Sequence, residues 1–571
     1  MTEDKLNNSN GINVATTVSP NDTATSIQTQ SPRNYRNGYK KQTSILEPVY
    51  KLVGIDDEPT AKELGTLILL GLVVILFIIS VTGFVIMWFT EVYDSQYTSK
   101  LILSNGSIAA QYWADPPVSP HLKVHIFNYT NIDDYLNGRA DKIHVDDLGP
   151  YTYNEHCTKK NVVFNTNFTV TYKDHRDYTF LPDFSNGFEW DKIVTPNVPL
   201  ITAAYKVKSM SYFEKTIKIT AIRSASRSPF HAKSAAEILW GYADEIIKLK
   251  NMFGSSSRNT FGMLMTRNGT SPDTFQIKTG EDGLQNLAVI QQFNGLTKLN
   301  YWRTNECNRI DGTDGSQFPP HLMENKERLH VFLPAFCRKI PLEFDEEIDI
   351  FHTFAKAWRY RTPLNVLSYD DDNSANQCYC SLGKCPLSGV FDGTLCYDDA
   401  PIFPSFPHFF SGDPKLYEKF EGIKPQKELH QTFADIHPRL AFPIGGASRI
   451  QINIQLHKQD LLDRELKRMD EGIILPILWL EITQGELNEE LQTLIFHSTF
   501  SANAIQYALK YGTLLICVTT LALLVAGVYY LGKFREKNLK RRNLTVSNNE
   551  MKSLKKRKTN DTINTEIPLS I

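Results

Sequence analysis

Two long, uncharged apolar runs constrain this chain more than any other feature. They cover residues 64–89 and 511–532, which is 26 and 22 residues. About 20 apolar residues are needed to cross the ~30 Å hydrocarbon core of a bilayer, and a longer run can tilt. The first run is too long and too far from the first residue to be a cleaved signal peptide. The sequence therefore predicts two membrane spans, one near each end of the 571 residues.

The charges beside these runs predict the orientation. Residues 533–571 carry a net charge of +7, whereas residues 1–63 carry −1. Flanks rich in Lys and Arg stay in the cytoplasm, so both termini are expected there. The predicted order is a largely disordered cytoplasmic tail (1–63), a span (64–89), an extracellular or lumenal ectodomain (90–510), a span (511–532) and a basic cytoplasmic tail (533–571). Low apolar content predicts disorder in the second tail too.

Cysteines and glycosylation sequons agree with an ectodomain outside the cytoplasm. Six of the eight cysteines cluster in its second half, and an even cluster in an oxidising compartment predicts three disulfides with fifteen possible pairings. A zinc site is the alternative, but the usual Cys and His spacings are missing. Cys157 is expected to be a free buried thiol, with a mixed disulfide as the alternative. The sequons at Asn105, Asn128, Asn167 and Asn268 are predicted glycosylation sites.

The segment between the spans mixes strand and helix patterns. Residues 161–173, 449–456 and 472–480 alternate and are rich in β-branched and aromatic residues, which predicts strands. Pro476 predicts an edge or a bend in the last of them. Helical spacing indicates helices within residues 198–222 and 232–249. Because no long linker or internal repeat is evident, we expect one α+β unit.

Residues 192–236 form a basic stretch, with eight Lys or Arg against the single acid Glu214. Apolar residues are interleaved at roughly helical spacing. A solvated helix face would explain the pattern. The alternative is an electropositive surface that steers anionic ligands, and segregation from an otherwise acidic ectodomain favours it.

Motifs for catalysis are absent from the sequence. It contains no P-loop, no G-x-S-x-G, no H-E-x-x-H and no G-x-G-x-x-G. The acidic run at residues 370–372 is more simply an exposed loop than a calcium site. Neither apolar run contains Asp, Glu, Lys, Arg or His, which disfavours a charge-lined channel. We therefore expect no enzyme, no cofactor and no metal site.

Five motifs in a fixed order resemble the class B scavenger receptor family, which includes fatty acid translocase, the high-density-lipoprotein receptor and lysosomal integral membrane protein type 2. They are GPYTY at residues 149–153, ILWGY at 238–242, NRIDGTDGSQFPP at 308–320, PHF at 407–409 and ILPILWLE at 474–481. Each motif alone is weak, but the ordered set is specific. The resemblance covers roughly residues 60–535.

This resemblance implies a fold of two terminal transmembrane helices that flank a large ectodomain. The ectodomain would have an antiparallel β-barrel-like core, an apical helical bundle and an apolar tunnel. It also implies the disulfides Cys307–Cys378, Cys337–Cys396 and Cys380–Cys385.

The resemblance further implies a receptor for fatty acids, sterols, phospholipids or lipoprotein particles. Such a receptor would capture its ligand at the apex and pass lipid along the tunnel. An apolar conduit spares each methylene a transfer cost of about 0.8 kcal/mol into water. The basic stretch aligns with the apical helices, so the candidate ligand-binding residues are Lys215, Lys218, Arg223, Arg227 and Lys233.

Other interpretations stay open. The chain could be a sorting receptor for a lysosomal protein partner, or a two-span channel, and it could form a homo-oligomer. No nucleic-acid partner is expected. The plasma membrane is the first expectation for location and the endolysosomal membrane the second. Residues 50–53 fit a tyrosine-based endocytic signal, and residues 566–571 only approximate an acidic dileucine signal.

Overall fold

A computed structural model describes residues 61–561 except 209, 227, 253–258, 351–354, 370, 381–383, 459–465, 467 and 486–488. By contacts the chain divides into two units, residues 74–532 and the two remaining ends together. Residues 1–60 and 562–571, with the expected N-terminal disorder and both sorting signals, lie outside the described residues.

Two long helices correspond to the predicted spans. Helix α2 covers Ala61–Phe89 and helix α13 covers Ala502–Asp561, and both contain stretches long and apolar enough to cross a membrane. Helix α13 continues past residue 532 through the basic tail, so the expected disorder is wrong for residues 533–561. Lys, Arg, Glu and Leu are favourable helix formers, and they allow the helix to continue beyond the apolar run.

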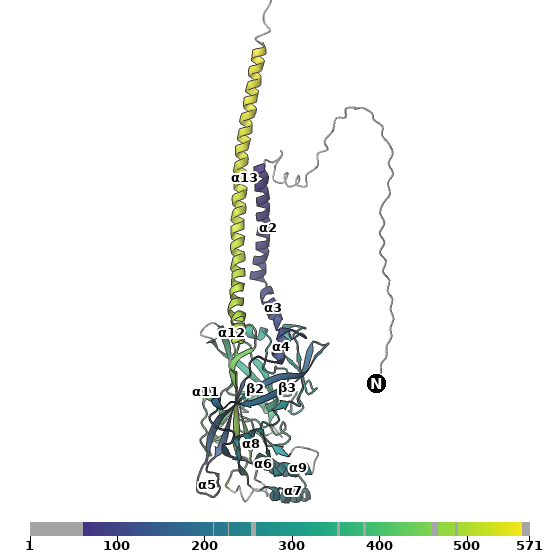
Figure 1. Ribbon diagram of the computed structural model, residues 1–571, viewed down its shortest axis with the longest axis vertical. Coiled ribbons are helices and arrows are strands. Elements are labelled where there is room, and N and C mark those ends of the chain that lie inside the picture. Colours follow the sequence, from purple (N-terminus) through teal and green to yellow (C-terminus); the bar gives the residue numbers. More distant parts are fainter. Residues whose placement is uncertain are drawn as a thin grey trace, which may run out of the picture. The chain divides into compact units, whose positions relative to one another are not determined.

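One large sheet dominates the ectodomain (Figure 1). Its strands are antiparallel except where β14 (Phe420–Glu421) joins β2; β8 (Gly269–Thr270) pairs with β3. In order across the sheet, the strands are β10 (Ile290–Phe293), β9 (Phe275–Lys278), β3 (Thr169–Phe180), β2 (Ile143–Asn165), β1 (His121–Tyr129), β17 (Ile474–Thr483), β16 (Pro443–Gln455), β15 (Phe433–Ile436), β13 (Ala355–Arg361), β12 (Arg338–Ile350) and β11 (Leu329–Leu333).

The sheet is not closed into a barrel, which corrects part of the expected fold. Among the described residues no ladder joins β10 to β11. A short segment of the GTDG motif lies between these two edges instead. The N–H of Ile290 donates to the carbonyl of Gly312 at 2.8 Å, and the N–H of Thr313 donates to the carbonyl of His330 at 3.0 Å. The segment therefore satisfies backbone groups of both edges without acting as a full strand.

The first and last strands of the ectodomain pair at the centre of the sheet. Strand β1 follows the first span and β17 precedes the second, and their antiparallel register places His121 opposite Thr483. This pairing brings the two connections toward the spans to one end of the ectodomain. There, the indole N–H of Trp88 donates to the carbonyl of Lys510 at 3.0 Å, and Tyr93 donates to the carbonyl of Ala502 at 2.9 Å.

Two strand predictions need correction. Residues 161–173 form no single strand, because β2 ends at Asn165 and β3 begins at Thr169; Phe168 in the turn has a φ of 57°. Alternation continues through a tight hairpin, so the pattern hides the turn. Pro476 does not mark an edge strand, since β17 pairs with both β1 and β16. The irregularity beside Asn453, its partner on β16, agrees with the alternative of a bend.

Helices and two small sheets lie around the main sheet. The small sheets pair β4 (Lys192–Pro196) with β5 (Phe230–Ser234), and β6 (Tyr242–Ala243) with β7 (Thr260–Phe261). The further α-helices are α3 (Val92–Thr98), α4 (Ile108–Ala114), α5 (Ile132–Leu136), α6 (Val198–Val207), α7 (Tyr212–Ala225), α8 (Ala235–Trp240), α9 (Glu245–Met252), α10 (His321–Glu324), α11 (Lys427–His430) and α12 (Glu489–Phe496).

The interior contains two large apolar clusters. The first joins helices α6 to α9 to the central strands and includes Leu200, Ile222 and Leu478. The second packs β3, β9, β10 and the cysteine-rich loops around Trp302 and Phe391. Each cluster is contiguous, so each provides the apolar contacts expected of a folded core.

The GPYTY motif has a backbone explanation. Gly149 has a φ of 125°, and a Cβ there would lie 2.6 Å from the carbonyl oxygen of Val124. Any side chain would clash with β1 and strain the backbone. The two tyrosines that follow, Tyr151 and Tyr153, are buried in the first cluster. The motif therefore combines a close strand approach with two core side chains.

Candidate functional site

Helices α6, α7 and α9 contact one another at the end of the ectodomain opposite α3, α4 and α12 (Figure 1). Helix α6 is mostly buried, and Asn197 caps it by accepting a hydrogen bond from the N–H of Leu200. Helix α7 buries only Ile222. The basic stretch predicted from the sequence thus contains one buried helix and one that faces solvent.

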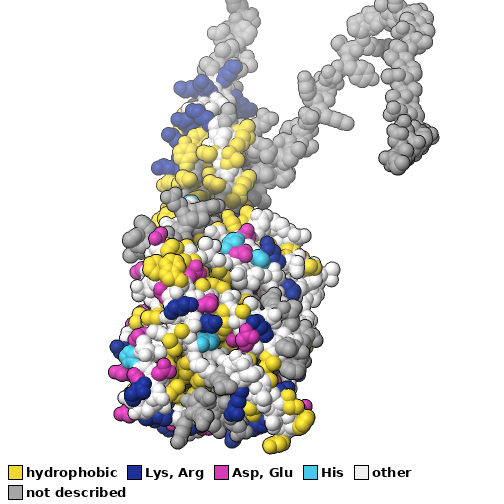
Figure 2. Space-filling view, turned by 60° about the horizontal axis from the view of Figure 1, so that its bottom comes forward, with side chains coloured by type: hydrophobic (Ala, Val, Ile, Leu, Met, Phe, Trp, Pro, Cys, Tyr) yellow, Lys and Arg dark blue, Asp and Glu magenta, His cyan; other side chains and the backbone are white. Residues whose placement is uncertain are grey.

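Helix α7 exposes apolar and basic side chains side by side. Tyr212 is 88% exposed, Phe213 75% and Ile217 50%. Lys218 and Arg223 are exposed on the same helix. Figure 2, turned to bring this end forward, shows hydrophobic side chains next to Lys and Arg at its lower edge. Large aromatic side chains rarely face water without a partner, so α7 is the most evident candidate interaction surface. We call these five residues the α7 surface.

The other candidate residues differ in their surroundings. Lys215 lies on α7 but is half-buried. Lys233 lies on β5, with its Nζ 4.3 Å from the centre of the Tyr242 ring. Burial, and then the charge of Lys233, lower the pKa of neighbouring His231 to about 4. Arg227 lies outside the described residues. The structure therefore puts three of the five candidates on α7 and Lys233 on a neighbouring strand.

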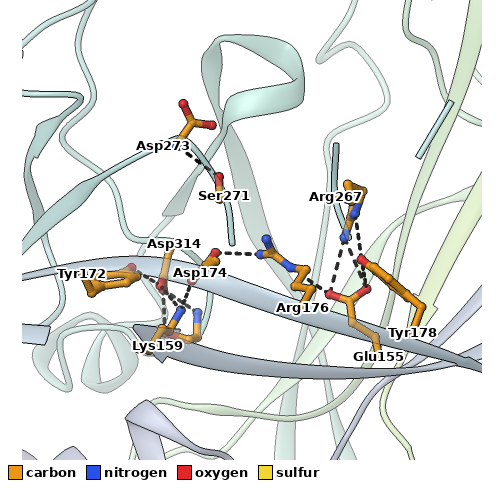
Figure 3. Close-up of polar contacts among 11 residues, drawn as sticks. Glu155, Lys159, Tyr172, Asp174, Arg176, Tyr178, Arg267, Ser271, Asp273 and Asp314 are labelled. Atoms are coloured by element: carbon orange, nitrogen blue, oxygen red, sulfur yellow. Dashed lines mark hydrogen bonds and ion pairs between the residues drawn. The ribbon is translucent and has the colours of Figure 1, made fainter. Parts of the chain in front are cut away.

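Sequence reasoning missed a cluster of buried and half-buried charges centred on β2 and β3 (Figure 3). On one side, Glu155 accepts hydrogen bonds from Arg176 at 3.0 Å and from Arg267 at 3.3 Å. On the other side, the Nζ of Lys159 lies 2.8 Å from Asp174 and 3.6 Å from Asp314. Asp174 also pairs with Arg176 at 2.7 Å and joins the two halves. We call these six residues the strand network.

The strand network holds its charges because they compensate one another. Burial opposes ionisation of Asp314, but the charge of Lys159 and hydrogen bonds from Ser316 and Tyr172 outweigh it, so the pKa of Asp314 is below its ordinary value. Burial likewise opposes the charge on Lys159, yet Asp314 and Asp174 raise the pKa of Lys159. The network sets three basic side chains against three acidic ones. Such a network is stable only when each charge keeps its partners.

The location of the strand network explains part of the NRIDGTDGSQFPP motif. Asp314 belongs to that motif, and Tyr172 donates a hydrogen bond to it at 2.7 Å. The network lies between Tyr153 of the first apolar cluster and Tyr172 of the second. The alternation of Glu155, Cys157 and Lys159 along β2 was the available sequence signal, because it places three polar groups on one face. Burial raises the pKa of the Cys157 thiol, which is a free cysteine here.

The other sites concern covalent chemistry. The structure contains the disulfides Cys307–Cys378, Cys337–Cys396 and Cys380–Cys385, the pairs implied by the resemblance. Three sequon asparagines, Asn105, Asn167 and Asn268, are exposed. Asn128 is half-buried in β1, and its side-chain oxygen accepts the N–H of Val194 at 2.9 Å. The geometry separates Asn128 from the other three, since it is half-buried within a strand and the others are exposed.

Two membrane-spanning helices and a β-rich ectodomain with three disulfides define a two-span membrane protein whose bulk lies outside the bilayer. Comparison with known proteins identifies it further. Residues 70–529 match the model of the CD36 family. Human lysosome membrane protein 2 is 35% identical over 69% of this chain and 80% of its own length. Bovine scavenger receptor class B member 1 is 28% identical over 82% of this chain and 90% of its own. The chain belongs to the CD36 family.

Proposed function

We propose that this chain is a class B scavenger-type receptor that binds lipids or lipoprotein particles through the α7 surface. The observation that carries the proposal is the exposure of Tyr212, Phe213 and Ile217 beside Lys218 and Arg223. Apolar side chains can enter the surface of a lipid particle, while cations attract its anionic groups over longer distances. In this proposal α6, α7 and α9 form the apical bundle.

We further propose that lipid moves toward the membrane along the first apolar cluster. This cluster extends from Leu200 and Ile222 on the apical helices to Leu478 on β17, the strand that leads to the second span. The strand network lies beside this cluster and would exclude acyl chains from its own side, because desolvating paired charges is costly. Lipid extraction from the purified full-length protein tests the route: a stoichiometric sterol or fatty acid supports it, and a folded but lipid-free protein contradicts it.

Charge reversal tests the binding surface. Lys218→Glu with Arg223→Glu should slow the association of the full-length protein with phosphatidylserine-containing vesicles by about tenfold or more at low salt. The matched control is Lys100→Glu, an exposed lysine at the opposite end of the ectodomain. Tyr212→Ser with Phe213→Ser should speed dissociation instead. Unchanged association and dissociation in these variants would overturn the role of the α7 surface.

A second candidate function is sorting of a lysosomal protein partner. The likeness to lysosome membrane protein 2 favours it, and an exposed aromatic group fits a protein surface as well as a lipid one. The same variants distinguish the two functions. Loss of vesicle binding supports the lipid receptor, whereas intact vesicle binding with lost capture of a lumenal hydrolase supports the sorting receptor. Microscopy of the tagged protein would separate the plasma membrane from the endolysosomal membrane.

A further inference from the structure

A cavity of about 430 Å³ lies on a different part of the ectodomain from the α7 surface. Its wall is formed by the neighbouring strands β1, β2 and β17, and the chain from His408 to α11 covers it. The side chains that matter for its chemistry are Lys123, His125, Asp147, Lys424, His430 and Trp479. Helix α11 is labelled in Figure 1 and marks this side of the molecule.

The two carboxylates of the cavity already have donors within the protein. Asp147 accepts hydrogen bonds from His125 at 3.1 Å, from His408 at 3.0 Å and from the Trp479 indole at 3.1 Å. Burial opposes its ionisation, but the two histidines hold the pKa of Asp147 well below its usual range. Glu481 accepts from Lys123 at 3.0 Å and from Arg449 at 2.7 Å. Both acids are thus already paired with donors of the protein.

Hydrogen-bond donors remain available, by contrast. The N–H of Gln426 donates to Nδ1 of His430 at 2.9 Å, so the proton of the neutral ring is on Nε2. His430 is 3% exposed and lines the cavity, and its Nε2 has no hydrogen-bond partner among the described residues. Lys424 is exposed at the rim of the cavity and pairs with no carboxylate among the described residues. Both groups can therefore donate a hydrogen bond to a ligand or to water in the cavity.

His408 shows how this arrangement is held in place. Its Nδ1 accepts the N–H of Lys424 at 3.1 Å while its Nε2 donates to Asp147. Its ring stacks on His430 with centroids 4.5 Å apart. Both nitrogens of His408 are therefore occupied, and the described residues contain no cluster of three ligands suited to a metal ion. The remaining groups, Lys424 and Nε2 of His430, are hydrogen-bond donors and would suit a ligand with acceptor atoms rather than a cation.

We propose that this cavity binds a small organic anion. Its carboxylate or phosphate would accept hydrogen bonds from Nζ of Lys424 and Nε2 of His430. Its apolar body would lie against Trp479, Leu429 and Pro150, which supply the apolar part of the lining. The site is independent of lipid capture at the α7 surface.

Isothermal titration calorimetry of the full-length protein in detergent tests the site. Phenyl phosphate and benzoate are the probes, and benzyl alcohol is the neutral control of similar shape. Saturable one-to-one binding of at least one anion, at least about tenfold tighter than benzyl alcohol, is expected from charge-assisted hydrogen bonds. The absence of saturable binding of both anions, or equal binding of the alcohol, would overturn the proposal.

Three variants localise the binding. Lys424→Gln and His430→Asn should each weaken anion binding by about tenfold. Asparagine can still accept the N–H of Gln426 but lacks Nε2. The matched control is Lys427→Gln, an exposed lysine of α11 that does not line the cavity. Wild-type affinity in Lys424→Gln, or equal weakening in Lys427→Gln, would contradict the site even if His430→Asn fails to fold.

Discussion

Two regions of the ectodomain are held together by different chemistry. On β2 and β3, the strand network ties the interior through compensated charges, and the free thiol of Cys157 lies on β2 between Glu155 and Lys159 of the network. In the loops after residue 300, three disulfides link the chain, and the cysteines of two of them, Cys307–Cys378 and Cys337–Cys396, belong to or pack against the second apolar cluster. Ion pairs need both partners in place but resist reductants, whereas disulfides resist acid and yield to reduction. We therefore expect loss of a charged partner to destabilise the first region and reduction to destabilise the second.

Arg338 makes the contrast sharper. It is 3% exposed, follows Cys337, and donates to Asn376 at 2.9 Å. Its guanidinium carbon lies 3.8 Å from the centre of the Tyr379 ring. It has no ion pair in the described chain, and burial lowers its pKa. The disulfide-linked region thus holds a cation against an aromatic ring, while the strand network provides each cation with a carboxylate.

The largest effect is expected in the strand network. Lys159→Ala leaves Asp174 and Asp314 buried without their cation, which should cost about 3–5 kcal/mol of unfolding free energy. Lys160→Ala is the matched control, because it changes an exposed lysine on the next residue of the same strand. Thermal denaturation of both full-length variants measures the difference. Equal melting temperatures would mean that the network contributes nothing to stability.

Disulfide removal tests the other region. Loop-closure entropy predicts a cost of about 4 kcal/mol for Cys337→Ala with Cys396→Ala and about 2 kcal/mol for Cys380→Ala with Cys385→Ala. The first pair is separated by 59 residues and the second by 5. Denaturation of the two double variants gives the order. The reverse order would show that loop length does not govern this region.

The pH dependence of stability tests a third feature, the buried histidine His430, separately from the ion pairs and the disulfides. Burial, and then the neighbouring His408, lower the pKa of His430 to about 3. Unfolded histidine titrates near its ordinary value of about 6.5. The contribution of neutral His430 to the free energy of unfolding is therefore complete above the ordinary histidine pKa. It is lost as the pH falls toward 3, by about 2 kcal/mol at pH 5. Between pH 7 and pH 5, the free energy of unfolding of His430→Asn should fall correspondingly less than that of the wild-type protein. An equal fall in the two proteins, measured by denaturation, would contradict the assignment.

The smallest effect is expected at exposed cations. Lys218→Ala should change the free energy of unfolding by less than about 0.5 kcal/mol, because surface substitutions away from buried partners rarely matter for stability. Its melting temperature provides a baseline for Lys159→Ala. A large loss would show that Lys218 supports the fold rather than a ligand.

Several features could be predicted from sequence because they depend on local composition or on ordered motifs. The apolar runs at 64–89 and 511–532 are long enough to define spans without tertiary information. The five motifs led to the family, and the helices near residues 198–222 followed from spacing alone. The end of the second long helix did not follow, because helix propensity carries α13 beyond the apolar run.

The candidate sites required tertiary structure. Lys159 and Asp314 lie far apart in the chain, and only the sheet and the GTDG segment bring them within 3.6 Å. His125, Asp147, His430 and Trp479 come from four separate elements, so no local pattern connects them. The sequence by itself determined the spans, the family and the basic stretch, because hydropathy and charge act locally. Only the tertiary structure decided which charges are paired, because burial and partnership depend on contacts distant in sequence.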